Sequence, residues 1–408
     1  AIEFSERRSR GLGGIPRGST PRRFILMNRE KRWMLVRFSV DNYRGFSKPI
    51  TIDFTETHDY KFNQICVKKG LLNKIAIYGQ NGSGKSNLGF ALFDIVFLLT
   101  DKNAVRQQLD DTSFINADSG RAEASFEYVF RNGSDELTYI YRKTAPRTLS
   151  FEELYINGDK IFSFDFINKE ADLVHMERIG APNLTLEYFE GNFPLLRHVA
   201  NNTIQKEDSH VRFIMNFVSH MLWFRSLQEN GYIGLKRGVQ DLNAWIIENN
   251  LSEAFNQFLL KLAGIKTNLE VAMIQVNQIP VKILIDKHET HNLLFDNVKS
   301  SGTSALQLLF YWSNYFKEVS FLFMDEFDAF YHFELARKVI EFVVGFENMQ
   351  TIFTTHNSYL ASNEVLRPDC YFILQNGELR SFVDSTDREL REGHNLEKML
   401  RNGEFNKF

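Results

Sequence analysis

The stretch Gly79-Gln80-Asn81-Gly82-Ser83-Gly84-Lys85-Ser86 matches the pattern G-x-x-x-x-G-K-[ST] completely. It follows a short apolar run, 74–78, of the kind buried in parallel sheets, and precedes residues 86–99, which are expected to form a helix. Glycines let backbone N–H groups approach a ligand closely, and the N-terminal end of a helix attracts anions. The stretch therefore predicts an α/β fold with a loop that holds nucleotide phosphates.

We call 79–86 the Walker A loop, and the expected cofactors are ATP and Mg²⁺. Lys85 is expected to reach the β and γ phosphates, and the hydroxyl of Ser86 to hold Mg²⁺. A glycine turn followed by a surface lysine is the structural alternative. The expected nucleotide-binding residues are Gly79, Gln80, Asn81, Gly82, Ser83, Gly84, Lys85, Ser86 and Asn87.

A second apolar run, 321–324, ends in the acids Asp325 and Glu326. Asp325 is expected to bind Mg²⁺, as in the strand called Walker B. Glu326 is expected to point to the opposite side of the strand end and to orient and polarise the attacking water. Adjacent acids that simply begin a loop are the alternative, but their presence in one chain with the Walker A loop favours catalysis.

A third strand-like run, 351–355, ends at His356 and Asn357. Open α/β sheets bind ligands at the carboxyl ends of their strands, so His356 is expected to donate a hydrogen bond to the γ phosphate. The run His288-Glu289-Thr290-His291 is one residue short of the metalloprotease pattern HExxH, which predicts a polar turn.

The order of these motifs resembles the ATPase head shared by ABC proteins, SMC proteins, RecF and the OLD family, and 34–46 is similar to the first strand pair of those heads. The resemblance implies a P-loop NTPase fold of ABC/SMC head type, with a β subdomain and a helical lobe inserted between Walker A and a signature segment. It places that segment at Ser300, Ser301, Gly302 and Thr303, before a helix over 305–316. Either Ser300 or Ser301 aligns with the signature serine.

In such heads the signature segment faces the Walker A site of a neighbouring chain. The resemblance therefore implies a homo-oligomer, either a dimer or a higher even-numbered ring. The Ser-Ser-Gly-Thr form, with Asp-Glu-Phe-Asp at Walker B, is typical of OLD-like AAA ATPases of bacterial anti-phage modules. Among these the chain most resembles the ATPase of the PARIS module, whose partner is a Toprim-like nuclease.

Three functional hypotheses follow from the resemblance. The first is a slow ATPase that senses infection, through a phage-encoded trigger, and controls a separate effector, expected to be a nuclease. The second is a DNA-repair ATPase of RecF type that acts on DNA. The third is a scaffold that binds nucleotide without turnover. The long Walker A to Walker B interval argues against a transporter subunit, and too few residues follow His356 for an appended nuclease domain.

The predicted organisation has four parts. Residues 1–33 form a basic, flexible arm with eight Arg and one Lys against three Glu, and 34–205 form an ATPase lobe with the β subdomain. Residues 206–265 are predicted as a helical lobe, and 266–408 as the second ATPase lobe, which ends in a hairpin over 371–383. The expected strand runs are 124–130, 137–141 and 154–156; the expected helical runs are 211–224 and 242–262.

Composition supports a soluble, globular protein. Of the 408 residues 43% are hydrophobic, and only two are cysteines, which fits a reducing, cytoplasmic location. No apolar stretch reaches the ~20 residues that span a bilayer, and no signal peptide is expected. The net charge of −3 does not indicate nucleic-acid binding by the whole molecule. The basic arm either contacts nucleic acid or is dispensable, and Met27 and Met34 are candidate natural starts.

Overall fold

The computed structural model describes residues 33–101, 113–186, 189, 193–225, 231–235 and 241–406. The chain divides into two units, 1–32 and 33–408. The predicted basic arm lies outside the described residues, except for its last residue, Trp33. This side chain is buried, and its ring contacts His210 and Phe213, so the folded unit begins one residue before the predicted start at Met34.

A seven-stranded sheet forms the centre of the folded unit, in the order β12-β11-β16-β17-β5-β18-β19. The five inner strands are parallel, and the two edge strands are antiparallel to their neighbours. The strands are β5 (Lys74–Tyr78), β11 (Met221–Arg225), β12 (Gly231–Gly234), β16 (Phe321–Asp325), β17 (Gln350–Thr355), β18 (Tyr371–Gln375) and β19 (Glu378–Ser381). Burial on both faces explains the unbroken apolar runs at β5 and β16.

A second seven-stranded sheet is antiparallel, in the order β10-β9-β8-β7-β6-β1-β2. Its strands are β1 (Met34–Asp41), β2 (Ile50–Asp53), β6 (Ala124–Asn132), β7 (Asp135–Ala145), β8 (Thr148–Ile156), β9 (Asp159–Asp165) and β10 (Glu170–Leu173). Strands β6 to β10 follow Walker A, as predicted for the β subdomain, whereas β1 and β2 precede it. The predicted first strand pair is confirmed as the antiparallel pair of β1 and β2. The three predicted strand runs are confirmed too, and each is longer than expected.

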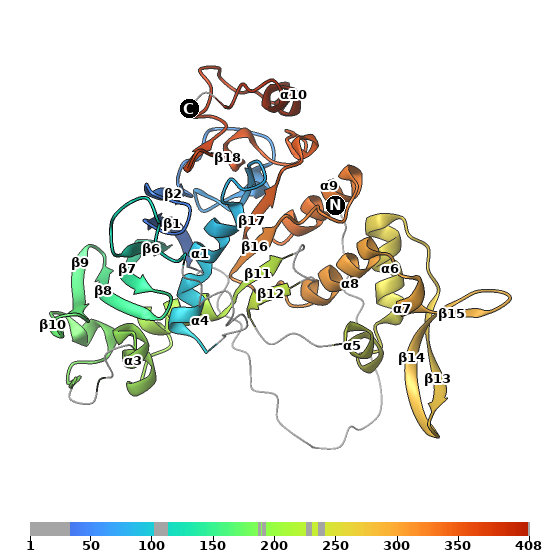
Figure 1. Ribbon diagram of the computed structural model, residues 1–408, viewed down its shortest axis with the longest axis horizontal. Helices are drawn as coiled ribbons and strands as arrows, with labels where there is room; N and C mark the ends of the chain where they lie inside the picture. The colour runs from blue at the N-terminus through green and yellow to red at the C-terminus, as the bar shows by residue number, and fades with distance from the viewer. Residues whose placement is uncertain are drawn as a thin grey trace. The chain divides into compact units, whose positions relative to one another are not determined.

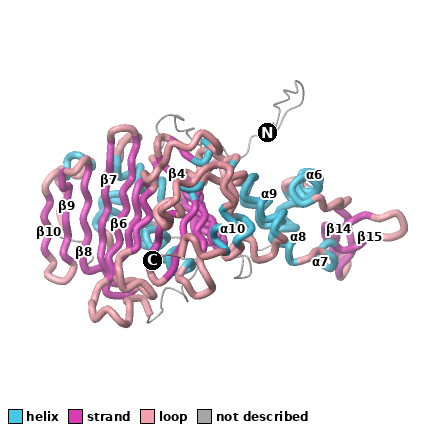
Figure 2. The backbone as a smooth tube through the Cα atoms, turned by 90° about the horizontal axis from the view of Figure 1, so that it is seen from above, coloured by secondary structure: helices cyan, strands magenta, loops and turns pink. Residues whose placement is uncertain are grey.

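Helix α1 (Lys85–Leu99) packs against both sheets (Figure 1), and Figure 2 shows strands β6 to β10 of the antiparallel sheet side by side. Tyr128 of β6 donates its hydroxyl hydrogen to the carbonyls of Ala91 and Leu92. On the other side Gly89 lies against Trp223 of β11 and Phe323 of β16, where a Cβ would come within 2.8 and 2.9 Å of their rings. Because α1 begins at the Walker A loop, both sheets fix the position of the nucleotide site.

The remaining helices and short elements surround these sheets. They are η1 (Gln64–Cys66), β3 (Val67–Lys68), β4 (Leu71–Leu72), η2 (Met176–Ile179), α3 (Leu195–Asn202), α4 (His210–Ser219), α5 (Leu242–Glu248), α6 (Ser252–Ala263), α7 (Phe295–Val298), α8 (Ser301–Ser313), α9 (Phe333–Val344), η3 (Ser358–Leu360), η4 (Pro368–Cys370) and α10 (Leu396–Arg401). A three-stranded sheet, β13 (Leu269–Val276), β14 (Ile279–Lys287) and β15 (Asn292–Leu294), stands next to α5, α6 and α7.

The predicted helix over 211–224 is wrong in its second half. Helix α4 ends at Ser219, and the next residues form β11, which pairs in parallel with β16. Residues 206–265 are therefore not a purely helical lobe, because they supply β11 and β12 to the central sheet. The predicted helix over 242–262 is two helices, α5 and α6, separated at Asn249 and Asn250; Asn250 has φ 55°, a conformation that asparagine tolerates.

Two further expectations are confirmed. The hairpin near the C-terminus is formed by β18 and β19. Residues 288–291 lie between β14 and β15 and are not helical.

Across the described parts of the chain, no group of three or more His, Cys, Asp or Glu residues is placed to hold a metal ion, and no helix is long and apolar enough to cross a membrane.

Candidate nucleotide-binding site

The Walker A loop connects the carboxyl end of β5 to the first residue of α1. Gly84 caps α1 with φ 102°, and a Cβ there would lie 2.8 Å from the ring of Phe46. A Cβ on Gly79 would lie 2.4 Å from the hydroxyl oxygen of Ser83 and 2.8 Å from the carbonyl oxygen of Leu374. Space therefore favours glycine at position 79, and both backbone geometry and space favour it at position 84.

Lys85 is 3% exposed, and its ammonium group points back over the loop. It donates to the carbonyl oxygens of Gly79 (2.8 Å) and Gln80 (3.1 Å) and lies 3.8 Å from a carboxylate oxygen of Glu326. Burial lowers the pKa of Lys85, and the charges of Glu326, Asp325 and Asp328 oppose that shift. The ammonium is thus held at the centre of the loop, where a phosphate would accept its hydrogen bonds.

Ser86 and Asp325 meet directly, although they are far apart in the sequence. The Ser86 hydroxyl donates to one carboxylate oxygen of Asp325 (2.8 Å), and the Thr354 hydroxyl donates to the other (2.8 Å). Burial raises the pKa of Asp325, and these two hydrogen bonds oppose the shift. A hydroxyl and a carboxylate are the hard oxygen ligands that Mg²⁺ prefers, so the pair fits the predicted metal site.

Glu326 follows β16 in a left-handed backbone conformation, with φ 43°. Its backbone N–H donates to the hydroxyl of Thr354 (2.9 Å). While Asp325 turns to Ser86, Glu326 turns to Lys85, so the two acids contact successive residues at the start of α1. The Glu326 carboxylate remains 18% exposed and can reach solvent.

His356 lies just beyond the carboxyl end of β17, beside β16 and β5, and it is exposed. The strand end is fixed by a chain of hydrogen bonds: the N–H of Asn357 donates to the Thr355 hydroxyl (3.0 Å), which donates to Asp328 (2.9 Å). Burial raises the pKa of Asp328, and the Thr355 hydroxyl opposes the shift. The structure therefore places His356 at the same sheet edge as the two Walker motifs.

The other predicted phosphate-loop residues differ in exposure. Gln80, Asn81 and Gly82 are exposed at the tip of the loop, Ser83 is half-buried, and Asn87 is half-buried in the first turn of α1. The N–H of Ser83 donates to the Gln80 carbonyl (3.1 Å), which closes the loop.

The signature segment forms the start of α8. Ser300 caps the helix, because its hydroxyl accepts from the N–H of Thr303 (3.1 Å). Ser300 and Ser301 are exposed, while Thr303 is buried, and a Cβ on Gly302 would lie 3.1 Å from the Phe330 carbonyl oxygen. The exposed serines thus turn to solvent beside the loop that follows Walker B.

Arg225 is a site residue that the sequence analysis missed. It is the last residue of β11, opposite Asp325 in the strand register, and is 6% exposed. Its guanidinium lies 4.9 Å from the ring centres of Phe90 and Trp223. Burial lowers the pKa of Arg225, and the charge of Asp325 opposes the shift. No sequence pattern marks it, because the expected helix over 211–224 hides the strand that it ends.

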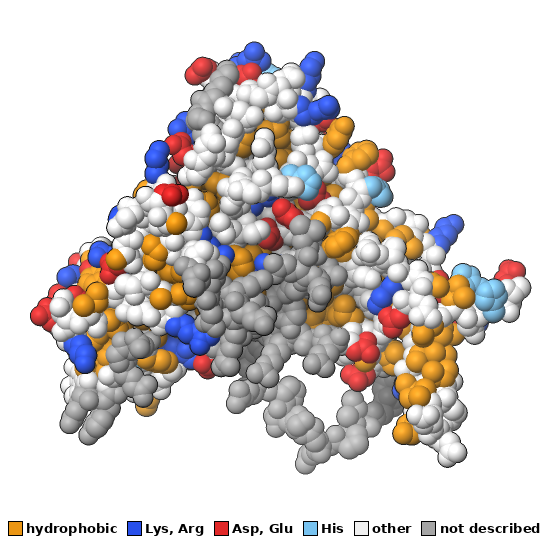
Figure 3. All heavy atoms as spheres, in the orientation of Figure 1, with side chains coloured by type: hydrophobic (Ala, Val, Ile, Leu, Met, Phe, Trp, Pro, Cys, Tyr) orange, Lys and Arg blue, Asp and Glu red, His pale blue; other side chains and the backbone are white. Residues whose placement is uncertain are grey.

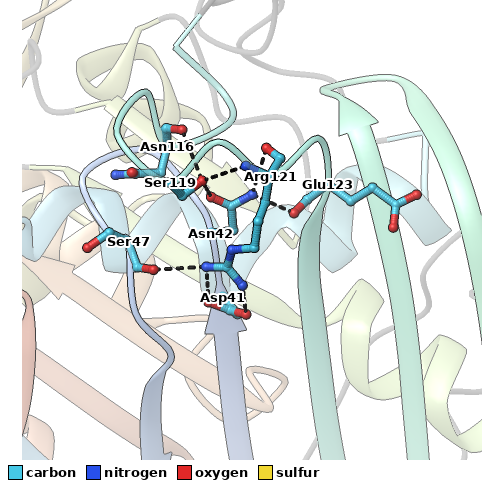
Figure 4. A network of polar contacts seen from close by, with 7 residues as sticks. All are labelled: Asp41, Asn42, Ser47, Asn116, Ser119, Arg121 and Glu123. Atoms are coloured by element: carbon cyan, nitrogen blue, oxygen red, sulfur yellow. Dashed lines mark hydrogen bonds and ion pairs between the residues drawn. The ribbon is translucent and has the colours of Figure 1, made fainter.

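Figure 4 shows a polar network next to the turn that carries Phe46. Phe46 in turn packs against Gly84 of the Walker A loop. Arg121 makes a bidentate ion pair with Asp41 and donates to the Ser47 carbonyl (2.8 Å). The buried amide of Asn42 donates to the carbonyls of Arg121 (3.1 Å) and Glu123 (2.7 Å). Because Phe46 packs on Gly84, this network also fixes the start of α1.

A P-loop at the end of β5, an acid pair at the end of β16 and the strand order of the central sheet define an α/β P-loop ATPase fold of the ABC/SMC head type. The family model described as "AAA domain, putative AbiEii toxin, Type IV TA system" matches residues 74–362. The chain belongs to this family, and it is an ATPase of the AAA type.

Solved structures similar to the chain include three SMC heads. The head domain from Thermotoga maritima is 17% identical, with a TM-score of 0.39, over 85% of this chain and 97% of that one. A head bound to the C-winged helix domain of ScpA is 16% identical, with a TM-score of 0.44 and coverages of 85% and 96%. A head with an extended coiled coil, from Pyrococcus furiosus, is 14% identical, with a TM-score of 0.43 and coverages of 85% and 95%. Among curated proteins, no match is found.

Proposed function

We propose that the chain is a cytoplasmic ATPase subunit that senses phage infection and controls a separate effector, a Toprim-like nuclease, through ATP-dependent rearrangement of a homo-oligomer. The observation that carries the proposal is the signature segment: its serines are exposed at a helix start. A site that needs a signature from a second chain couples nucleotide binding to assembly. The family description names a toxin, which supports the proposal that the chain acts together with a toxic effector protein.

Each residue of the site has a separate role in ATP hydrolysis. Lys85 would exchange the carbonyls of Gly79 and Gln80 for the β and γ phosphates. Ser86 and Asp325 would hold Mg²⁺, which would neutralise phosphate charge. Glu326 leaves Lys85 and accepts a proton from the attacking water. His356 donates a hydrogen bond to the γ phosphate. Slow ATP turnover suits the proposed sensor, because the protein must remain in one nucleotide state long enough to control its effector.

Phage challenge tests the proposal. Bacteria that carry the chain with its native neighbouring genes should form fewer phage plaques than bacteria that carry Lys85→Ala or Glu326→Gln in the same genes. Deletion of a neighbouring nuclease-like gene should remove protection while leaving the ATPase activity of the chain intact. Equal plaque numbers in all strains would overturn the proposal, and a loss of survival after DNA damage instead would favour DNA repair.

A further inference from the structure

Two adjacent threonines at the end of β17 hold two acids on opposite faces of the central sheet. The Thr354 hydroxyl donates to Asp325 (2.8 Å), and the Thr355 hydroxyl donates to Asp328 (2.9 Å). Successive side chains of a strand point to opposite faces, so the two acids are held on different sides of the sheet. Asp325 belongs to the predicted Mg²⁺ site, whereas Asp328 needs another explanation.

Asp328 lies in the turn that follows β16, and its side chain is 7% exposed. Its Oδ2 accepts from the Thr355 hydroxyl, whereas its Oδ1 is buried and accepts no hydrogen bond of regular geometry from the described residues. Burial raises the pKa of Asp328, and the Thr355 hydroxyl, the charge of His356 and the Asn357 side chain oppose the shift. Because a buried carboxylate with an unpaired oxygen lowers the stability of a fold, stability alone does not explain an acid here.

The contacts of Asp328 reach both neighbours of His356 along the chain. The Thr355 hydroxyl donates to Asp328 and accepts from the N–H of Asn357 (3.0 Å). One carboxylate therefore holds the backbone on both sides of His356, whose side chain stays exposed. In Figure 3, histidine and acidic side chains lie close together at the surface near the middle of the visible face.

We propose that Asp328 is a positioning residue for ATP hydrolysis, which sets the place of His356 relative to the Walker B acids through the Thr355 hydroxyl. Asp328 and Glu326 share one turn, which the N–H of Ala329 closes on the Glu326 carbonyl (3.0 Å). The turn that carries the expected base thus also carries the group that holds His356. Placement matters, because a shift of ~1 Å in a reacting group can cost ~10²-fold in rate. The inference rests on the ATPase role of His356 in the proposed function and does not need phage defence.

The test measures kcat and the Kd for a slowly hydrolysed ATP analogue with the purified full-length chain. Asp328→Ala and Thr355→Val each break the chain of hydrogen bonds. Both should lower kcat about tenfold, the usual effect of one lost hydrogen bond to a charged group, while Kd stays unchanged.

The matched control is Thr351→Val, the same substitution on the same strand and face but at the other end of β17. Thr351 pairs with Lys74, whereas Thr355 pairs with Tyr78 beside the Walker A loop. The control should keep the wild-type kcat. Asp328→Asn keeps an acceptor for the Thr355 hydroxyl, and Thr355→Ser keeps the hydroxyl itself, so these conservative variants should recover most of the wild-type rate.

A double-mutant cycle separates a positioning role from a purely structural one. If Asp328 acts through His356, adding Asp328→Ala to His356→Ala should slow turnover by no more than about twofold beyond His356→Ala alone. Two losses that multiply would overturn the inference. Unchanged kcat in Asp328→Ala and Thr355→Val, or a loss of ATP affinity as large as the loss of kcat, would overturn it too.

The outcomes also distinguish this inference from the proposed function. A wild-type rate in His356→Ala would overturn both the inference and the proposed role of His356. A non-multiplying cycle in a chain that gives no protection against phage would support the inference and overturn phage defence alone.

Discussion

The ammonium group of Lys85 is held by two carbonyls of its own loop and by Glu326. These partners give the buried ammonium hydrogen bonds and a negative charge in place of the phosphates that it would contact in the nucleotide complex. The same arrangement holds a carboxylate oxygen of Glu326 3.8 Å from the lysine ammonium. The resting site is thus charge-balanced and preorganised.

Lys85→Ala should weaken ATP binding roughly tenfold or more, because a charge-assisted hydrogen bond to phosphate is worth ~1.5 to 3 kcal/mol. Titration with a fluorescent ATP analogue measures the change. Lys338→Ala, an exposed lysine on α9, is the control and should bind as the wild type does. Wild-type affinity in Lys85→Ala would refute the assignment of the phosphate loop.

Glu326→Gln should spare ATP binding and slow hydrolysis by ~10² to 10⁴-fold, because the amide keeps the shape but cannot accept the proton of water. It also removes the ion pair with Lys85, which frees the lysine for phosphate. Binding and single-turnover hydrolysis are measured on the same sample. Normal turnover would show that another group is the base.

The role of some site residues can be predicted from the sequence, whereas the role of others depends on strand pairing. Lys85, Ser86 and Asp325 belong to patterns whose chemistry fixes residue type and spacing. Thr354 does not: its hydroxyl holds both Asp325 and the backbone of Glu326, a role that exists only because β17 lies beside β16. Arg225 depends in the same way on the pairing of β11 with β16.

Among the elements, the Walker A loop depends on space as well as on backbone geometry. Gly84→Ala should lower the free energy of unfolding by ~1 to 3 kcal/mol, because its Cβ would press on Phe46 at 2.8 Å in a conformation with φ 102°. Gly82→Ala shares the positive φ but has nothing within 4 Å, so it should cost less. Denaturant unfolding without nucleotide separates the two, and equal losses would contradict the packing argument.

Helix α3 is tied to β8 by one buried carboxylate. Glu152 accepts from the N–H groups of Leu195 (2.6 Å) and Leu196 (2.9 Å) and from the Tyr139 hydroxyl (2.9 Å). Burial raises its pKa from 4.5 to about 7, and these hydrogen bonds oppose the shift. Between these two values the folded state binds more protons than the unfolded state, so stability falls as the pH rises through that window.

Glu152→Gln should therefore flatten the pH dependence of the melting temperature between about pH 4.5 and about pH 7. The difference amounts to at most ~3 kcal/mol for a pKa shift of this size. Glu153→Gln, the next residue on β8, is the control and should keep the wild-type slope. Identical slopes in all three proteins would show that Glu152 does not titrate in this window.

Among the elements, the pattern of apolar residues along the sequence predicted most strands of the two seven-stranded sheets. Alternation identified β1 and β2, strand-like runs identified β6, β7 and β8, and apolar runs before polar ends identified β5, β16 and β17; β9 and β10 were not predicted. It failed at β11, because Met-Leu-Trp-Phe-Arg, buried on both faces, continues the apolar pattern of α4. The sheet of β13, β14 and β15 was not predicted, because its strands expose apolar residues and so lack the usual contrast with polar positions.

For the whole molecule, the proposed composite site predicts complementation between two inactive proteins. Lys85→Ala should be inactive alone, and so should Ser300→Ala with Ser301→Ala. Mixed oligomers should regain partial ATPase activity, because one site then has a wild-type Walker A loop from one chain and a wild-type signature from the other. Verified mixed oligomers without activity would leave Ser300 as an ordinary helix cap.

The order of the central sheet has a consequence for how the protein is made. β5, which leads into the Walker A loop, has β17 and β18 as its two neighbours, and these strands span Gln350–Thr355 and Tyr371–Gln375. A ribosome must therefore add about 300 further residues after β5 before both edges of that strand are paired; pairing over such separations is slow. A nascent chain carries an apolar, unpaired strand for most of its synthesis, which calls for chaperone protection. Translation that stops before β16 (Phe321–Asp325) yields a Walker A loop without the Walker B acids.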